Sequence, residues 1–265
     1  MLLKNKMLQK LIPLSQFSNY KIGGPAEYFY EFKNKDDIRL AIDEYKRIDP
    51  ELVNVFILGE GTNILFSDEG FNGLILKNSI KSINYDKGIL VVSSGVLFSD
   101  LNDFAIKNSI RGFEWSGGLP GSVGGAVRGN AGAHGGETKD NIVEVVSFDY
   151  KKQETVVRSD KDCLFDYRNS IFKSGEAASE IILSAKFRVD EGVSEKIQEE
   201  TNKKIEFRKE RHPLEYPNLG STFKNIPVEK VSTEILDEFR ASIKKDPFFV
   251  LPAVKLIVGA NLVSR

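Results

Sequence analysis

The chain has 265 residues, of which 41% are hydrophobic and 28% are charged, as in an ordinary globular protein. Its 37 Lys and Arg residues balance 38 Asp and Glu residues, so there is no overall basic charge to attract nucleic acid or an anionic membrane. No apolar run approaches a membrane span or a signal-peptide core. We therefore expect a cytoplasmic protein with no membrane insertion and no nucleic-acid partner.

Strands and helices alternate through the first two thirds of the chain. Short β-branched, apolar segments predict strands at 53–58, 74–76, 89–92, 143–148 and 180–189. Apolar residues at helical spacing predict helices at 36–48 and at 99–108, the second with Ser99 as its N-cap, followed by a long charged helix at 194–209. Prolines and glycines then mark a boundary or an active-site loop, and two further helices are expected near 233–243 and 252–260.

Cysteine and histidine are too scarce to build a disulfide or a typical zinc site. The single cysteine, Cys163, cannot form an intramolecular disulfide and is expected to be a small buried residue. The two histidines, His134 and His212, have no carboxylates at a legible metal-binding spacing. We expect no metal, and both histidines to be satisfied or exposed to solvent.

Two glycine-rich segments suggest a dinucleotide. The first reads Gly-Glu-Gly-Thr-Asn over 59–63 and follows an apolar strand, so successive backbone N–H groups could bind an anion. A Rossmann fingerprint would need glycine at Ile64, and a tight strand-to-strand turn is the competing interpretation. The second, 116–136, is glycine-rich throughout, which favours a backbone wrapped round a pyrophosphate and a flat ring over a plain loop.

Two later residues are candidates for chemistry. Arg168 could hold a carboxylate through a two-pronged hydrogen bond, or form a structural ion pair with Asp166. Ser221 stands between a glycine and Thr-Phe on a predicted loop, where it could donate a proton or simply form a turn. No adjacent Ser, His and Asp arrangement supports nucleophilic catalysis.

Taken together, these segments resemble the UDP-N-acetylenolpyruvoylglucosamine reductase family (MurB). The matching blocks, in the family's order, are 19–26 (Asn-Tyr-Lys-Ile-Gly-Gly-Pro-Ala), 59–63, 118–126 with 130–133, 167–170 (Tyr-Arg-Asn-Ser) and 220–225 (Gly-Ser-Thr-Phe-Lys-Asn). The short interval between Tyr167 and Glu180 resembles the branch of the family that lacks an inserted tyrosine loop.

The resemblance implies an α+β protein with a two-part FAD-binding fold of the vanillyl-alcohol-oxidase type, followed by an α/β substrate domain. It places the FAD-binding domain at 1–190, in subdomains of about 14–78 and 79–190, and the substrate domain at 191–265. It also implies that NADPH reduces non-covalently bound FAD, which then reduces UDP-N-acetylglucosamine enolpyruvate to UDP-N-acetylmuramate for peptidoglycan.

The resemblance also implies roles for individual residues. Arg168 would hold the substrate carboxylate and steady the enol intermediate, and Ser221 would be the proton donor. Substrate contacts fall to Tyr167, Arg211, Lys224 and Asn225. Contacts with FAD fall to Gly59, Glu60, Gly61, Thr62, Asn63, Leu65, Pro120, Gly121, Ser122, Gly124, Gly125, Ala126, Asn130, Gly132 and Ala133.

One departure from the family is at the end of the chain. The family continues after the last apolar helix with a glycine-rich strand and a late catalytic glutamate, whereas this sequence ends at Arg265. We therefore expect an incomplete substrate domain and reduced turnover. The alternatives are a flavin oxidoreductase of the same fold that acts on another small substrate, and a flavin-binding remnant without turnover.

Overall fold

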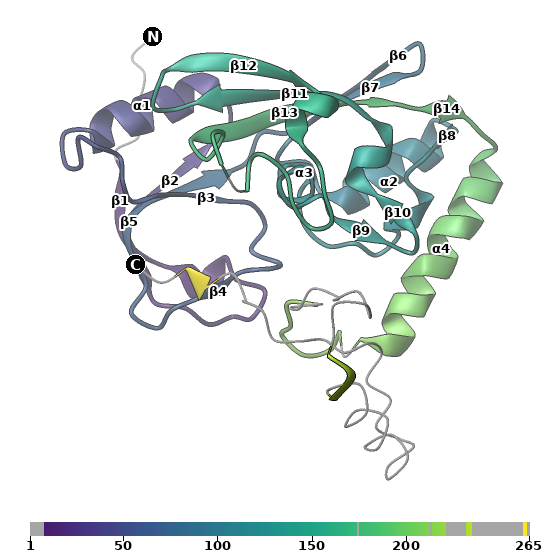
Figure 1. Cartoon of the computed structure of the whole chain (residues 1–265). Helices are drawn as coiled ribbons and strands as arrows, with labels where there is room; N and C mark the ends of the chain where they lie inside the picture. Colours follow the sequence, from purple (N-terminus) through teal and green to yellow (C-terminus); the bar gives the residue numbers. More distant parts are fainter. Residues whose placement is uncertain (1–7, 174, 213, 221–231, 235–261, 264–265) are drawn as a thin grey trace.

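The fold is built on two β-sheets that lie side by side (Figure 1). The computed structural model describes residues 8–173, 175–212, 214–220, 232–234 and 262–263. Within these ranges, no helix is both long enough and apolar enough to cross a lipid bilayer.

The first sheet has four strands and is mostly parallel. Its order is β1 (Gln9–Pro13), β2 (Pro25–Phe32), β5 (Phe71–Asn78) and β3 (Val55–Leu58). Only the β1–β2 pair is antiparallel. The predicted strands at 53–58 and 74–76 are confirmed as β3 and part of β5, whereas β1 and β2 were not predicted.

Helix α1 (Lys35–Tyr45) covers one face of this sheet, as the apolar spacing predicts. It begins after Asn34, whose side-chain oxygen accepts a hydrogen bond from the backbone N–H of Asp37 at 2.9 Å. Its four buried residues are the predicted ones: Ile38, Ala41, Ile42 and Tyr45. Phe148 and Ile181, from the second sheet, pack in the same cluster, so this core joins the two sheets.

The second sheet has five antiparallel strands. Its order is β12 (Glu154–Ser159), β11 (Ile142–Asp149), β13 (Glu180–Arg188), β7 (Ile89–Ser93) and β6 (Ile83–Asp86). Helices α2 (Phe98–Lys107) and α3 (Val123–Gly129) pack against it and form a core that includes the fully buried Cys163. The expected strands at 89–92, 143–148 and 180–189 and the buried cysteine are thus confirmed.

Helix α2 begins earlier than predicted, so the assignment of Ser99 as N-cap is wrong. The N-cap is Leu97, which makes no capping bond through its side chain. Leu97 instead forms an isolated antiparallel bridge with Ser122, and the N–H of Phe98 donates to the carbonyl of Gly121 at 3.0 Å. Burial of Phe98 and this link to the second glycine segment decide where the helix starts.

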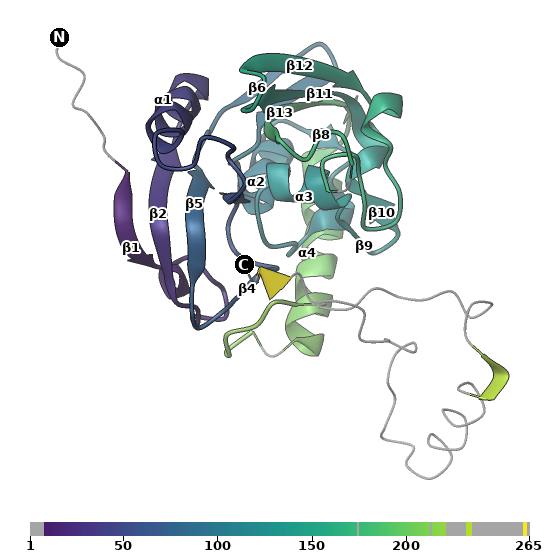
Figure 2. The same ribbon diagram turned by 60° about the vertical axis from the view of Figure 1, so that its left-hand side comes forward.

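The long charged helix is confirmed as α4 (Ser194–Arg211). It packs along the 3-10 helix Glu114–Ser116, α2 and β8 (Ile110–Arg111), and β8 pairs with β14 (Asp190–Glu191) (Figures 1 and 2). A small parallel pair joins β4 (Leu65–Phe66) to β15 (Leu262–Val263).

Two of the expected helices fall mainly where the structure describes nothing. The helix near 233–243 has only residues 233–234 within the described ranges, where they are helical, and the one near 252–260 lies wholly outside them. The domain boundaries stay a prediction. The strands of the first sheet end at Asn78 and those of the second begin at Ile83.

Candidate functional site

The first glycine segment follows β3 and is fixed to the N-terminal part of the chain. Gly61 adopts a φ of +64°, and a Cβ placed on it would lie 1.7 Å from the carbonyl oxygen of Phe17. The carbonyl of Gly61 also accepts a hydrogen bond from the N–H of Asn19 at 3.0 Å. Only glycine fits here, because both the backbone conformation and the space exclude a side chain.

The two glycine segments lie against each other, although they are far apart in the sequence. A Cβ on Gly59 would lie 2.9 Å from the Oγ of Ser122, and a Cβ on Gly121 would lie 2.8 Å from the Oγ1 of Thr62. The segments therefore present backbone and two hydroxyl groups to one another. This paired surface can approach a ligand closely and offer it N–H groups.

The sequence suggested that the second segment is a loop throughout. The structure instead places helix α3 within it. Ser122 caps this helix by accepting a hydrogen bond from the N–H of Gly125 at 3.4 Å. Gly124 is buried against the end of β7: its N–H donates to the carbonyl of Ser94 at 2.8 Å, and a Cβ would lie 2.8 Å from the Cβ of Ser94. Packing therefore requires glycine at position 124.

Packing also explains other glycines that the sequence interpretation attributed to a ligand. A Cβ on Gly117 would lie 2.5 Å from the carbonyl oxygen of Thr201 on α4. A Cβ on Gly136 would lie 2.4 Å from the Cγ of Trp115. The glycine density thus serves helix packing as well as the surface that Gly59 and Gly121 form.

Asn130 connects the second segment to the chemistry expected at Arg168. It ends α3 in the left-handed conformation and is fully buried. Its side-chain nitrogen donates to Glu137 Oε2 and to the carbonyl of Asp166, both at 3.0 Å, and its side-chain oxygen accepts from the N–H of Lys139 at 3.1 Å. With these bonds the Asn130 side-chain amide holds the hairpin formed by β9 (Gly132–Ala133) and β10 (Gly136–Glu137).

Arg168 lies over that hairpin. Its Nη2 donates to the carbonyl of Gly132 at 2.6 Å and its Nη1 to the carbonyl of Asn130 at 3.3 Å. Its ion pair is with Glu137, at 3.9 Å, rather than with Asp166 as one interpretation expected. Arg168 itself has a φ of +55°, in the left-handed region that non-glycine residues adopt uncommonly.

The guanidinium of Arg168 keeps the capacity for a further ligand. Its side chain is 34% exposed, and its carbon Cζ lies 5.0 Å from the ring centroid of Tyr167. Two of its five N–H groups make the bonds to backbone carbonyls, so the arrangement fixes the group while part of its fork faces outward. Such a fork suits a carboxylate.

A cleft of about 480 Å³ opens beside the paired glycine segments. Four parts of the chain line it, and six of the lining residues are Asn19, Lys21, Thr62, Pro120, Arg208 and Tyr216. Lys21 and Arg208, which sequence reasoning missed, bring positive charge to it. Burial lowers the pKa of Arg208, which nevertheless remains a cation at neutral pH. Lys21 lies in the family block 19–26, and this was the one feature of the sequence that could have indicated a role for Lys21 in the site.

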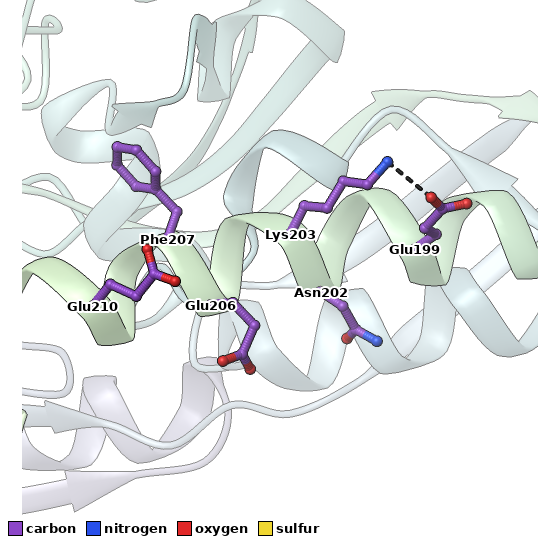
Figure 3. Close-up of a pocket in the computed structure, with 6 residues that line it drawn as sticks. All are labelled: Glu199, Asn202, Lys203, Glu206, Phe207 and Glu210. Carbon is purple, nitrogen blue, oxygen red and sulfur yellow. Dashed lines mark ion pairs between the residues drawn. The ribbon is translucent and has the colours of Figure 1, made fainter.

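A second hollow, of about 470 Å³, runs along α4 alone (Figure 3). All of its lining residues come from that helix, and Figure 3 shows Phe207 pointing away from Glu206 and Asn202. Lys203 pairs with Glu199 at 2.8 Å. With no opposite wall, this surface is a solvated helix face, and the cleft beside the glycine segments is the candidate site. No cluster of three or more His, Cys, Asp or Glu in the described ranges could hold a metal.

Comparison with known proteins shows the family of this chain. Residues 26–155 match the FAD binding domain family. The UDP-N-acetylenolpyruvoylglucosamine reductase of Carboxydothermus hydrogenoformans is 37% identical over 84% of this chain and 73% of its own length, and that of Caldanaerobacter subterraneus subsp. tengcongensis is 34% identical over 85% and 73%. The chain belongs to the UDP-N-acetylenolpyruvoylglucosamine reductase family.

A solved structure supports the same fold for this family member. The reductase (MurB) from Thermus caldophilus superposes with a TM-score of 0.69, covering 88% of this chain and 81% of its own, at 24% identity. With the matching FAD binding domain, this confirms the predicted α+β fold with a two-part FAD-binding arrangement. The recognition of the family from its blocks is likewise confirmed.

The remaining predicted site residues divide into two groups. Among the FAD candidates, the structure brings Gly59 to Ser122 and Thr62 to Gly121, and it places Tyr167 beside Arg168. Arg211 is the last residue of α4. The other candidates, Ser221, Lys224 and Asn225, lie outside the described residues. All of these individual roles stay predictions.

Proposed function

We propose that this protein is an NADPH-dependent flavoenzyme that reduces UDP-N-acetylglucosamine enolpyruvate to UDP-N-acetylmuramate during synthesis of peptidoglycan precursors. Family membership and the matching FAD binding domain support the reaction class. The observation that carries the proposal is the attachment of Arg168 to the backbone carbonyls of Asn130 and Gly132. It joins a cation that could bind a carboxylate to the second glycine segment.

The two glycine segments fit a dinucleotide. Cβ atoms at Gly59 and Gly121 would fill the space between the segments. The surface therefore depends on glycine, which has no Cβ, at both positions. The hydroxyls of Thr62 and Ser122 stand at the same place and can bond phosphate oxygens. When bound, FAD would supply a hydride for the enolpyruvyl double bond, and the segments would hold it without a covalent link.

Arg168 would bind the substrate carboxylate and stabilise the negative charge that develops as the double bond is reduced. A planar guanidinium can hold both carboxylate oxygens, and a cation fixed in advance needs no rearrangement during the reaction. The bonds to Asn130 and Gly132 supply that fixation.

Ser221 would donate the proton to the carbon next to the one that receives the hydride. Gly220, the residue before it, lines the cleft, which supports this assignment. We place the remaining substrate contacts at Tyr167, Arg211, Lys224 and Asn225. General acid catalysis by such a side chain typically contributes about 10²–10⁴-fold to the rate.

Stopped-flow measurement of the two half-reactions tests these roles. The purified protein should be yellow and should release FAD on heating. Ser221→Ala should leave reduction by NADPH intact and slow reoxidation by the substrate by about 10²–10⁴-fold. Arg168→Lys should slow the same half-reaction by about 10²–10³-fold, because a point charge cannot replace the fork.

A matched arginine provides the control. Arg47 is exposed in the turn after α1, so Arg47→Lys should leave both half-reactions unchanged. A colourless protein that takes up no added FAD would overturn the cofactor assignment. Equal slowing of both half-reactions by Ser221→Ala would overturn the proton-donor role alone.

A further inference from the structure

An acidic side chain stands inside the segment that would receive the FAD diphosphate. Glu60 lies between Gly59 and Gly61, and its side chain is 31% exposed. Two negative groups brought together at such a partly buried site repel each other strongly, because little water screens them. The segment therefore needs a cation if it is to accept a diphosphate.

Lys77 supplies that cation from the neighbouring strand. It lies on β5, is only 9% exposed as a residue, and its Nζ contacts Glu60 Oε1 at 2.7 Å. The same Nζ donates to the carbonyl of Asn78 at 3.3 Å. Lys77 also stands opposite Leu58 in the β3–β5 pairing, and Leu58 is the residue directly before the glycine segment. The ammonium is thus anchored in the sheet at the base of the segment.

The same part of β5 is also linked, through Ser94, to the second glycine segment. The side-chain nitrogen of Asn78 donates to the Oγ of Ser94 at 2.7 Å, and this bond is buried. The carbonyl of Ser94 in turn accepts the N–H of Gly124 at 2.8 Å. Adjacent residues of one strand therefore hold both glycine segments, which is the relation a shared ligand site requires.

We propose that Lys77 is a positioning residue for the cofactor: it neutralises and holds the Glu60 carboxylate, so that the segment 59–63 can accept the diphosphate of FAD. This inference rests on FAD binding in the proposed function. This proposal replaces the direct FAD contact that the family resemblance implied for Glu60. Because the Glu60 carboxylate is paired with Lys77, it would not bond the cofactor, and it would weaken cofactor binding if Lys77 did not pair with it. Lys77 acts through Glu60 and touches no reacting atom.

Four variants and a control test the inference through FAD affinity, without any measurement of turnover. The dissociation constant of FAD is measured on apoprotein by isothermal titration calorimetry for Lys77→Met, Lys77→Arg, Glu60→Gln and the Lys77→Met, Glu60→Gln double variant. The control, Lys186→Met, breaks a similar ion pair with Glu144, of 3.0 Å, in the second sheet. Thermal unfolding of each apoprotein shows whether it folds.

The expected pattern is asymmetric. Lys77→Met should raise the dissociation constant about tenfold or more, because it leaves a carboxylate without its cation at an anion site. The control should match the wild type. Lys77→Arg should keep most of the affinity, because the positive charge remains. Glu60→Gln should bind FAD as tightly as the wild type or more tightly, and the double variant should recover most of the affinity that Lys77→Met loses. Higher salt should reduce the differences in FAD dissociation constant between the variants and the wild type, because it screens the charges.

Other outcomes would overturn the inference in identifiable ways. Equal weakening by Lys77→Met and Glu60→Gln would show a merely structural contact, or a direct bond from Glu60 to the cofactor. A double variant as weak as Lys77→Met would show the same. If Lys77→Met fails to fold, Glu60→Gln still distinguishes the possible roles of the ion pair. Only the electrostatic role of Lys77 predicts that Glu60→Gln binds FAD at least as tightly as the wild type. Wild-type protein that binds no FAD would instead refute the proposed function itself.

Discussion

Arg168 and Gly132 are joined by a hydrogen bond of 2.6 Å from the guanidinium Nη2 to the backbone carbonyl. A Cβ on Gly132 would lie 3.1 Å from the Nη1 of Arg168 and 2.7 Å from the carbonyl oxygen of Gly136. The glycine therefore leaves the space that the arginine occupies. The proposed substrate-binding cation and the proposed cofactor segment are therefore joined directly, by hydrogen bonds to the carbonyls of Asn130 and Gly132.

Gly61 should be one of the least replaceable residues of the cofactor surface. In Gly61→Ala the new methyl group would collide with the Phe17 carbonyl, 1.7 Å away, in a backbone conformation that already disfavours alanine. The segment must shift, so we expect weaker FAD binding and a loss of unfolding free energy of about 1–3 kcal/mol. Chemical denaturation and FAD titration measure the two effects.

Gly129→Ala is the matched control for this substitution. Gly129 lies in α3 with open space where its Cβ would be, and its φ is not positive. Alanine there should stabilise the helix by up to about 1 kcal/mol. Similar behaviour of the two variants would mean that the contact between Gly61 and Phe17 does not constrain the segment.

Much of the fold could be predicted from local patterns. Helix α1 has its four buried residues at helical spacing, and the strands β3, β7, β11 and β13 are short apolar runs. In contrast, β2 was missed although it is largely buried, because Tyr28, Phe29 and Tyr30 are consecutive and show no alternation. Tertiary contacts decided the start of α2, since Phe98 is buried and bonded to Gly121.

The site was predictable as a set of segments but not as an arrangement. The blocks around Gly59, Gly121 and Arg168 indicated the family. Nothing in their spacing shows that Gly59 and Ser122 nearly touch, or that Lys77 reaches Glu60 from another strand. The pairing of distant segments is a property of the sheet register. The number of glycines also could not show which positions are fixed by packing, such as Gly117 against Thr201.

Breaking the Arg158–Glu180 ion pair should strongly destabilise the second sheet. The Glu180 side chain is 3% exposed, bonds to Arg158 through both oxygens, and accepts the Ser147 hydroxyl at 2.6 Å. Arg158→Met leaves the buried Glu180 carboxylate without its cation. This should lower the free energy of unfolding by about 3–5 kcal/mol, measured by urea denaturation. A second substitution, Glu180→Gln, should recover part of this loss.

Lys152→Met serves as the comparison for that pair. Lys152 pairs with Asp149 at 3.6 Å, but its side chain is 68% exposed, so its removal should cost less than about 1 kcal/mol. If both substitutions cost the same, or if Glu180→Gln recovers nothing, burial of the Glu180 charge would not be the cause of the loss.

Cys163 should be chemically inert in the folded protein. Its side chain is fully buried, and this burial raises the pKa of the thiol to about 12, against a smaller opposing effect of Arg158. At pH 8 the thiol is therefore protonated as well as inaccessible. A colorimetric thiol reagent should detect no reaction in native protein and one thiol per chain after denaturation. Rapid stoichiometric labelling of the native protein would contradict this account.

His134 should make the contact between the β9–β10 hairpin and α4 sensitive to acid. Its ring packs edge-on against Phe207 at 5.2 Å, and its pKa is lowered, first by burial and then by Lys204 and Arg208. Because the folded pKa lies below the unfolded value of about 6.5, this contribution to stability is complete above that pH. It is lost as the pH falls below about 6.5 and through the folded pKa.

The fluorescence of Trp115, the single tryptophan, provides the measurement. Trp115 lies outside the β9–β10 hairpin but packs against Gly136, which is part of it. If protonation of His134 loosens the hairpin, the emission of Trp115 should change as the pH falls below about 6.5. Asparagine tolerates the left-handed conformation of position 134 but does not titrate, so His134→Asn should remove the change. The other histidine is the control: His212→Asn should leave the transition in place. Loss of the transition in His212→Asn but not in His134→Asn would assign the acid sensitivity to the end of α4, and the lysine and arginine beside His134 would then have no part in it.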